Sequence, residues 1–141
     1  MTAITLAARD VLRPPGVPGT ALELIDRARH GLREAVDTAD QDDRYVLAHL
    51  SALRSAAAVL AVRGRPTRRG SGRLNVWVVL PKIAPELGEW AAYFAAGAAR
   101  RQAIEAGRSG VVSTRDADDL VRAATDFLDV VSTELGVLPI R

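Results

Sequence analysis

Apolar residues recur every three or four positions through most of this 141-residue chain. That spacing places them on one face of an α-helix. Glycine and proline interrupt the pattern at only a few points, and these points divide the chain into separate helical segments. The pattern therefore predicts an all-α protein.

The segments predict one short and four long helices, joined by short connections. Their ranges are 21–39, 41–63, 74–84, 86–106 and 114–135. Thr20 with Glu23, and Ser113 with Asp116, have the spacing of a capping box, in which two residues exchange hydrogen bonds at a helix start. Short connections favour antiparallel neighbours, so we expect an up-and-down antiparallel bundle of about five helices.

The segment 74–84 allows two interpretations. Its centre reads Val-Trp-Val-Val-Leu, which by composition alone suits a strand. A single strand in a helical chain has nothing to pair with, so a short helix is the preferred prediction. Pro81 and Pro85 then interrupt it, and Pro85 suits the first position of the next helix.

Aromatic residues are scarce at 4%, so the core must be built mainly from Ala, Leu and Val. Trp77, Trp90, Tyr93 and Phe94 are predicted to anchor that core, with an aromatic interface as the alternative. Residues 90–99 are apolar almost all round. A helix of this kind is expected to be central in the bundle or covered by a second subunit.

The chain is long enough for one domain. We predict a flexible Pro/Gly-containing arm over 1–19, a helical domain over 20–136 and a tail over 137–141. The chain has no cysteine, and no acidic group has metal-ligand spacing with a histidine, so neither a metal nor a cofactor is expected. The longest apolar run, 56–62, is far short of a membrane span, and the first residues do not resemble a signal peptide. These features predict a cytoplasmic protein without membrane contact.

One of the two histidines, His49, follows Arg44 by five residues. Histidine transfers protons near neutral pH, and arginine stabilises the charge that builds up on a phosphorane. The pair is therefore a candidate catalytic site. Tyr45 is a candidate auxiliary residue because it shares the helix face of His49, and Asp43 is a second one.

A glycine-rich segment after the second helix carries five arginines and no acidic residue. They are Arg63, Arg65, Arg68, Arg69 and Arg73. Such a segment suits contacts with nucleic-acid phosphates that do not read the bases. The alternative is a solvated loop.

Residues 85–97 read Pro-Glu-Leu-Gly-Glu-Trp-Ala-Ala-Tyr-Phe-Ala-Ala-Gly. Together with Arg44-x4-His49 and the arginine segment, this block resembles a small actinobacterial family of HEPN domains over about residues 20–135. The resemblance implies a helical bundle that pairs as a homodimer. In active HEPN proteins the Arg and His of both subunits face each other and cut RNA without metal, leaving a cyclic phosphate. The resemblance implies that Arg44 and His49 have these same roles in this chain.

A structural interpretation of the motif stays open beside the catalytic one. Five residues turn an ideal helix by about 140°, so Arg44 and His49 point to different sides. Arg44 would then pair with Asp40 or Asp43, and His49 would lie at the core edge, bonded to a backbone carbonyl or a carboxylate. The functional hypotheses are an RNA-binding protein or metal-independent endoribonuclease and, alternatively, a non-catalytic module for an unknown protein partner. An open cleft at Arg44 and His49 would favour the first.

Overall fold

The computed structural model describes residues 16–64 and 75–137, and within these ranges it contains helices and no strand. The α-helices are α2 (Gly19–Asp37), α3 (Gln41–Arg63), α4 (Val76–Ile83), α5 (Gly88–Glu105) and α6 (Thr114–Leu135). A 3-10 turn, η1 (Pro85–Leu87), precedes α5. The predicted all-α class is confirmed, as is the helical prediction for the segment around Trp77.

The ends of the five α-helices lie within two residues of their predicted positions. The bounds of α3 and α6 agree with the predicted ranges. Ser113 and Asp116 form the predicted capping box, with bonds of 3.0 Å from the Asp116 N–H and 2.9 Å from the Ser113 N–H. The prediction for Thr20 is wrong, because α2 already begins at Gly19 and makes no side-chain cap bond. Val17, inside the predicted arm, is buried against the bundle.

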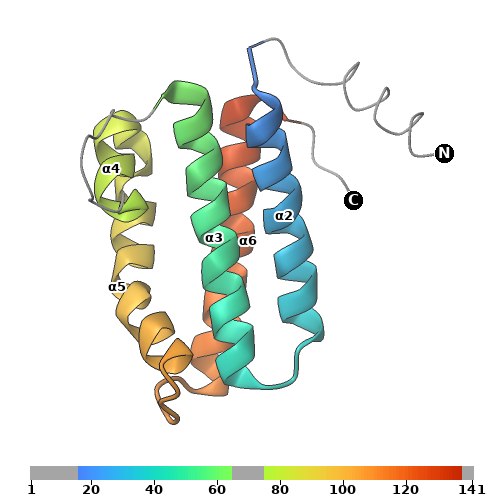
Figure 1. Ribbon diagram of the computed structural model, residues 1–141, viewed down its shortest axis with the longest axis vertical. Helices are drawn as coiled ribbons and strands as arrows, with labels where there is room; N and C mark the ends of the chain where they lie inside the picture. Colours follow the sequence, from blue (N-terminus) through green and yellow to red (C-terminus); the bar gives the residue numbers. More distant parts are fainter. Residues whose placement is uncertain (1–15, 65–74, 138–141) are drawn as a thin grey trace, which may run out of the picture.

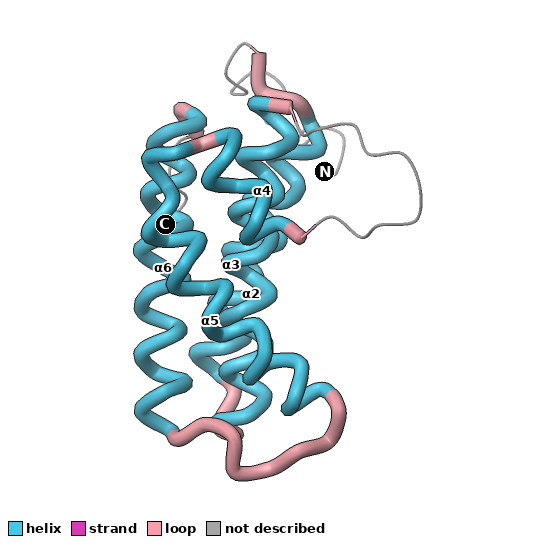
Figure 2. The backbone as a smooth tube through the Cα atoms, turned by 90° about the vertical axis from the view of Figure 1, so that its left-hand side faces the viewer, coloured by secondary structure: helices cyan, strands magenta, loops and turns pink. Residues whose placement is uncertain are grey.

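The long helices run in alternate directions around α3 (Figure 1). α3 packs against α2 and α6 on one side and against α4 and α5 on the other. The tube view shows the same elongated bundle from the side (Figure 2). Among the described residues, α3 is the one helix that by length and composition could cross a membrane, with a mean hydropathy of 1.6 over its most apolar window. Its central position explains this apolarity, since four helices cover it.

Aromatic rings join α4, α5 and α6 into one cluster. The ring of Phe94 lies 5.3 Å from Trp77 and 5.2 Å from Phe127, and Trp90 lies 5.4 Å from Phe127. Trp77 and Phe94 are buried, as the core prediction requires, and Trp90 is half-buried. Tyr93 is a correction, because 47% of it is exposed.

Only one side of α5 is buried within the chain. Ala91, Phe94 and Gly97 face the core. The opposite face exposes Ala92, Tyr93, Ala95, Ala96 and Ala99. The prediction that the bundle itself covers this helix on more than one side is therefore wrong. The alternative, that a second subunit covers this face of α5, stays a prediction.

Gly97 lies at a close contact between α5 and α3. A Cβ atom at this position would lie 2.8 Å from the Tyr45 hydroxyl and 3.4 Å from Cδ2 of His49. We expect Gly97→Leu to lower the free energy of unfolding by about 1–3 kcal/mol, because buried neighbours would have to move. Urea unfolding followed by circular dichroism measures this. Gly88→Ala is the matched control on the same helix, since a Cβ there meets nothing within 4 Å. Equal stability of both variants would contradict the close approach.

Candidate functional site

Arg44 and His49 both belong to α3, but their side chains leave it in different directions. This is the divergence of about 140° expected for five residues of helix. Arg44 faces the end of α2 and the start of α6, while His49 faces α5. The structure therefore does not bring the two side chains together within one chain. Their catalytic assignment stays a prediction.

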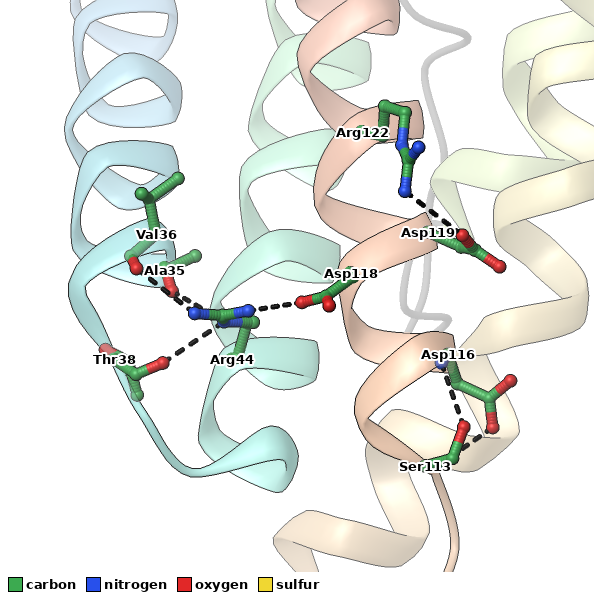
Figure 3. A network of polar contacts seen from close by, with 9 residues as sticks. All are labelled: Ala35, Val36, Thr38, Arg44, Ser113, Asp116, Asp118, Asp119 and Arg122. Carbon is green, nitrogen blue, oxygen red and sulfur yellow. Dashed lines mark hydrogen bonds and ion pairs between the residues drawn. The ribbon is translucent and has the colours of Figure 1, made fainter.

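Arg44 ties the C-terminus of α2 to α6 (Figure 3). Its Nε donates to the carbonyls of Ala35 and Thr38, each at 3.1 Å, and its Nη2 donates to the carbonyl of Val36 at 3.2 Å. Its Nη1 forms an ion pair with Asp118. Carbonyls at a helix end lack intrahelical donors and carry partial negative charge, so a guanidinium group stabilises them.

The predicted structural partners of Arg44 are not the observed ones. The Asp40 side chain caps α3 instead, accepting the Asp43 N–H at 2.9 Å. Asp43 itself is exposed in the first turn of α3. The actual partner, Asp118, lies 74 residues away in sequence. No local spacing pattern points to it.

His49 is 0% exposed and has a partner at each ring nitrogen. Nε2 lies 2.8 Å from the carbonyl oxygen of Phe94, and Nδ1 lies 3.0 Å from Nε of Arg101. A carbonyl only accepts and a guanidinium N–H only donates. The contacts therefore place the proton on Nε2 and leave Nδ1 as the acceptor. This is a neutral imidazole that is fixed in one tautomer.

The surroundings of His49 oppose its protonation. Burial lowers the pKa of the ring, the Phe94 carbonyl acts in the other direction, and the charge of Arg101 lowers the pKa further. Glu105 counteracts part of this effect and bonds Arg101 at 2.7 Å. Trp77 lies against the ring, with centroids 5.9 Å apart. Sequence reasoning anticipated a carbonyl partner but missed Arg101, which is 52 residues away.

Tyr45 lies beside His49, as its spacing predicts, and both approach Gly97. Burial raises the pKa of the Tyr45 hydroxyl, and the charge of Arg100 offsets part of that shift. Tyr45 lies at the inner end of an open groove between α5 and α6. The residues brought together around His49 are therefore Tyr45 and Arg101, and Arg44 is not among them.

Two adjoining hollows of about 240 and 630 Å³ form this opening, here called the α5/α6 groove. They share Tyr93 and Asp119. The other lining residues are Tyr45, Glu89, Trp90, Ala96, Gly97, Arg100, Asp116, Leu120, Arg122, Ala123 and Asp126. No sequence motif indicated this groove.

Arg65, Arg68, Arg69 and Arg73 lie outside the described residues. Arg63 is described, and it lies 2.6 Å from Glu86 and 2.6 Å from Glu134. The hydrogen bond from Arg63 is the main cause that lowers the pKa of Glu86 to about 2. Two carboxylates thus neutralise Arg63, although its predicted phosphate contact stays a prediction. Among the described residues, no group of three His, Cys, Asp or Glu could hold a metal ion.

The all-helical bundle, together with a family-model match, defines a HEPN-like helical protein. The sequence model of the SAV_6107-like HEPN family matches residues 35–132, from the end of α2 into α6. The chain therefore belongs to the SAV_6107-like HEPN family. Searches of curated proteins and of solved structures found no match.

Proposed function

We propose that this HEPN protein is a non-catalytic interaction module, in which Arg44 and His49 maintain the fold. The observation that carries the proposal is the complete burial of His49 with both ring nitrogens bonded. A general base must reach the proton that it removes, directly or through one water molecule. Here Nε2 faces a carbonyl of α5 and Nδ1 faces a guanidinium group, so neither nitrogen meets solvent.

Arg44 supports the same proposal. Its guanidinium group bonds three carbonyls at the end of α2 and the carboxylate of Asp118. A phosphate ligand would have to displace Asp118 and would meet the negative end of the α2 dipole. Arg44 therefore stabilises a helix junction and is poorly placed to stabilise a phosphorane.

An interaction module also needs an accessible surface. The outer face of α5 exposes four alanines and Tyr93. Small side chains let another backbone approach closely, and an exposed tyrosine supplies a large contact area with one polar end. This surface continues into the α5/α6 groove. We therefore place partner binding there.

A metal-independent endoribonuclease is the second candidate. The contact of Arg101 with His49 favours it, because this contact does pair an arginine with the histidine. Such an enzyme would use the ribose 2′-hydroxyl as nucleophile and would require α5 to uncover His49. RNA binding would then draw on the arginine segment 63–73, in a salt-dependent way.

RNA cleavage separates the two candidates. We expect the purified full chain to leave single-stranded RNA intact in EDTA, because His49 cannot accept a proton from the 2′-hydroxyl. The assay follows product ends by gel and by detection of 2′,3′-cyclic phosphate. His49→Gln and Arg44→Lys, checked for folding by circular dichroism, serve as controls. Cyclic-phosphate products from the wild type that disappear in either folded variant would establish the ribonuclease instead.

A further inference from the structure

We propose that the α5/α6 groove binds an arginine-bearing helix of a partner protein. This inference rests on the proposed interaction function and specifies its partner. α5 packs closely on α3 and α4, and α6 packs closely on α3 and α2, while α5 and α6 meet through the aromatic rings of Trp90, Phe94 and Phe127. Their backbones are therefore held apart, and the groove runs between them. Tyr45 of α3 lies at its inner end.

The length of the groove suits a short helix. Its α6 wall extends from Asp116 to Asp126, which is about 15 Å of helix at 1.5 Å per residue. A partner helix of about ten residues has the same length. Ala96 of α5 and Ala123 of α6 have small side chains, so the backbone of a partner helix can approach the groove closely there. Binding of a helix in a groove between helices is a common recognition mode.

Aromatic rings line the α5 wall. Tyr93 is one of three large hydrophobic residues that are exposed in the described part of the chain, with Val36 and Val78. It borders both hollows, and half-buried Trp90 borders the larger one. Tyrosine and tryptophan faces attract guanidinium groups through the ring quadrupole. The wall therefore favours arginine over a purely apolar side chain.

The charge of the groove selects the same partner. Four carboxylates line it, compared with two guanidinium groups, whereas the whole chain carries a net charge of +2. The carboxylates belong to Glu89, Asp116, Asp119 and Asp126. Figure 3 shows Asp119 on the α5 side of α6, while Asp118 points to Arg44. A phosphate backbone would be repelled here, and an arginine side chain would be attracted.

The ion pairs of Asp119 within the chain are weak enough to be exchanged. Arg122 contacts it at 3.3 Å and Arg115 at 4.0 Å, and both arginine side chains are largely exposed. Exposed pairs of this kind contribute little to stability. An incoming guanidinium group that is held against Tyr93 can therefore take their place.

The test uses a defined probe, a 15-residue alanine-based helical peptide with four arginines on one face. Isothermal titration calorimetry on the full chain measures the affinity. NMR chemical-shift changes of the backbone amides show where the peptide binds. We expect shifts along α5 and α6. The double variant Asp119→Arg/Asp126→Arg should weaken binding at least 10-fold, and Tyr93→Ala about 10-fold. Glu23→Arg/Glu34→Arg, on exposed positions of α2, makes the same change in net charge and should bind as the wild type does.

Three results would overturn the proposal. The first is equal affinity of the wild type and the Asp119/Asp126 variant, and the second is equal affinity for a peptide with glutamate in place of arginine. The third is a different occupant of the groove. It would be seen as RNA that changes the chemical shifts of the same backbone amides, or as a homodimer that the Asp119/Asp126 variant converts to a monomer. The proposed function fails separately, through RNA cleavage that depends on His49. The two failures are therefore distinguishable.

Discussion

Replacing His49 by alanine is expected to lower the free energy of unfolding by about 3–5 kcal/mol. The change opens a cavity between α3 and α5 where a fully buried ring now lies against Trp77 and Phe94. It also removes the acceptor of the Arg101 Nε–H and a donor to the Phe94 carbonyl. Polar groups that lose buried partners add to the cost. Urea unfolding followed by circular dichroism measures the loss.

A double-variant cycle separates packing from hydrogen bonding. His49→Leu keeps most of the volume but leaves Arg101 without its acceptor. Arg101→Leu removes the donor, and the combination replaces both partners by apolar groups. We expect the double variant to be more stable than the sum of the two single losses predicts. Additive losses would show that the contact of Arg101 with His49 contributes nothing to the fold.

The pH dependence of stability gives an independent measurement. In the unfolded chain His49 is protonated near pH 6.5, while burial lowers the pKa of folded His49. Above about pH 6.5 both states of His49 are neutral and its contribution is fully present. As the pH falls further, the unfolded state binds a proton that the folded state excludes, and stability falls by up to about 1.4 kcal/mol per pH unit. The His49→Leu/Arg101→Leu variant should lose this part of the slope.

The positions of the long helices could be predicted because they depend on local patterns. Periodic apolar residues and the Ser113 capping box act within one or two turns, so the bounds of α3 and α6 agree with the sequence. The segment around Trp77 followed from a simple topological argument, since a lone strand has no partner. The predicted cap at Thr20 was wrong because a capping-box spacing does not identify which residue begins the helix.

The candidate site could be predicted only in part. The helix geometry alone separates Arg44 from His49, and a backbone carbonyl partner for His49 was among the alternatives. The partners Asp118 and Arg101 depend on how α6 and α5 pack against α3, which no local spacing encodes. The exposure of Tyr93 was missed for a similar reason. Its neighbour Phe94 faces the core, and one position along the helix turns a side chain by about 100°.

Replacing Arg44 by methionine is expected to lower the free energy of unfolding by about 2–3 kcal/mol. The methionine keeps an apolar stem but leaves the last carbonyls of α2 without their shared donor and Asp118 without its cation. This loss of stability is smaller than that for breaking a fully buried ion pair, because the Arg44–Asp118 pair is partly open to solvent. Thermal and urea unfolding of the full chain measure it.

Arg44→Lys tests the geometry of this junction. A lysine supplies one point charge, whereas the observed contacts use separate edges of a planar group toward α2 and α6. We therefore expect the lysine variant to recover less than half of the loss. Asp118→Asn should cost less than Arg44→Met, because the helix-end carbonyls keep their donor. If Arg44→Met unfolds like the wild type but abolishes a cleavage activity, Arg44 acts in catalysis and its place at the α2 terminus is incidental.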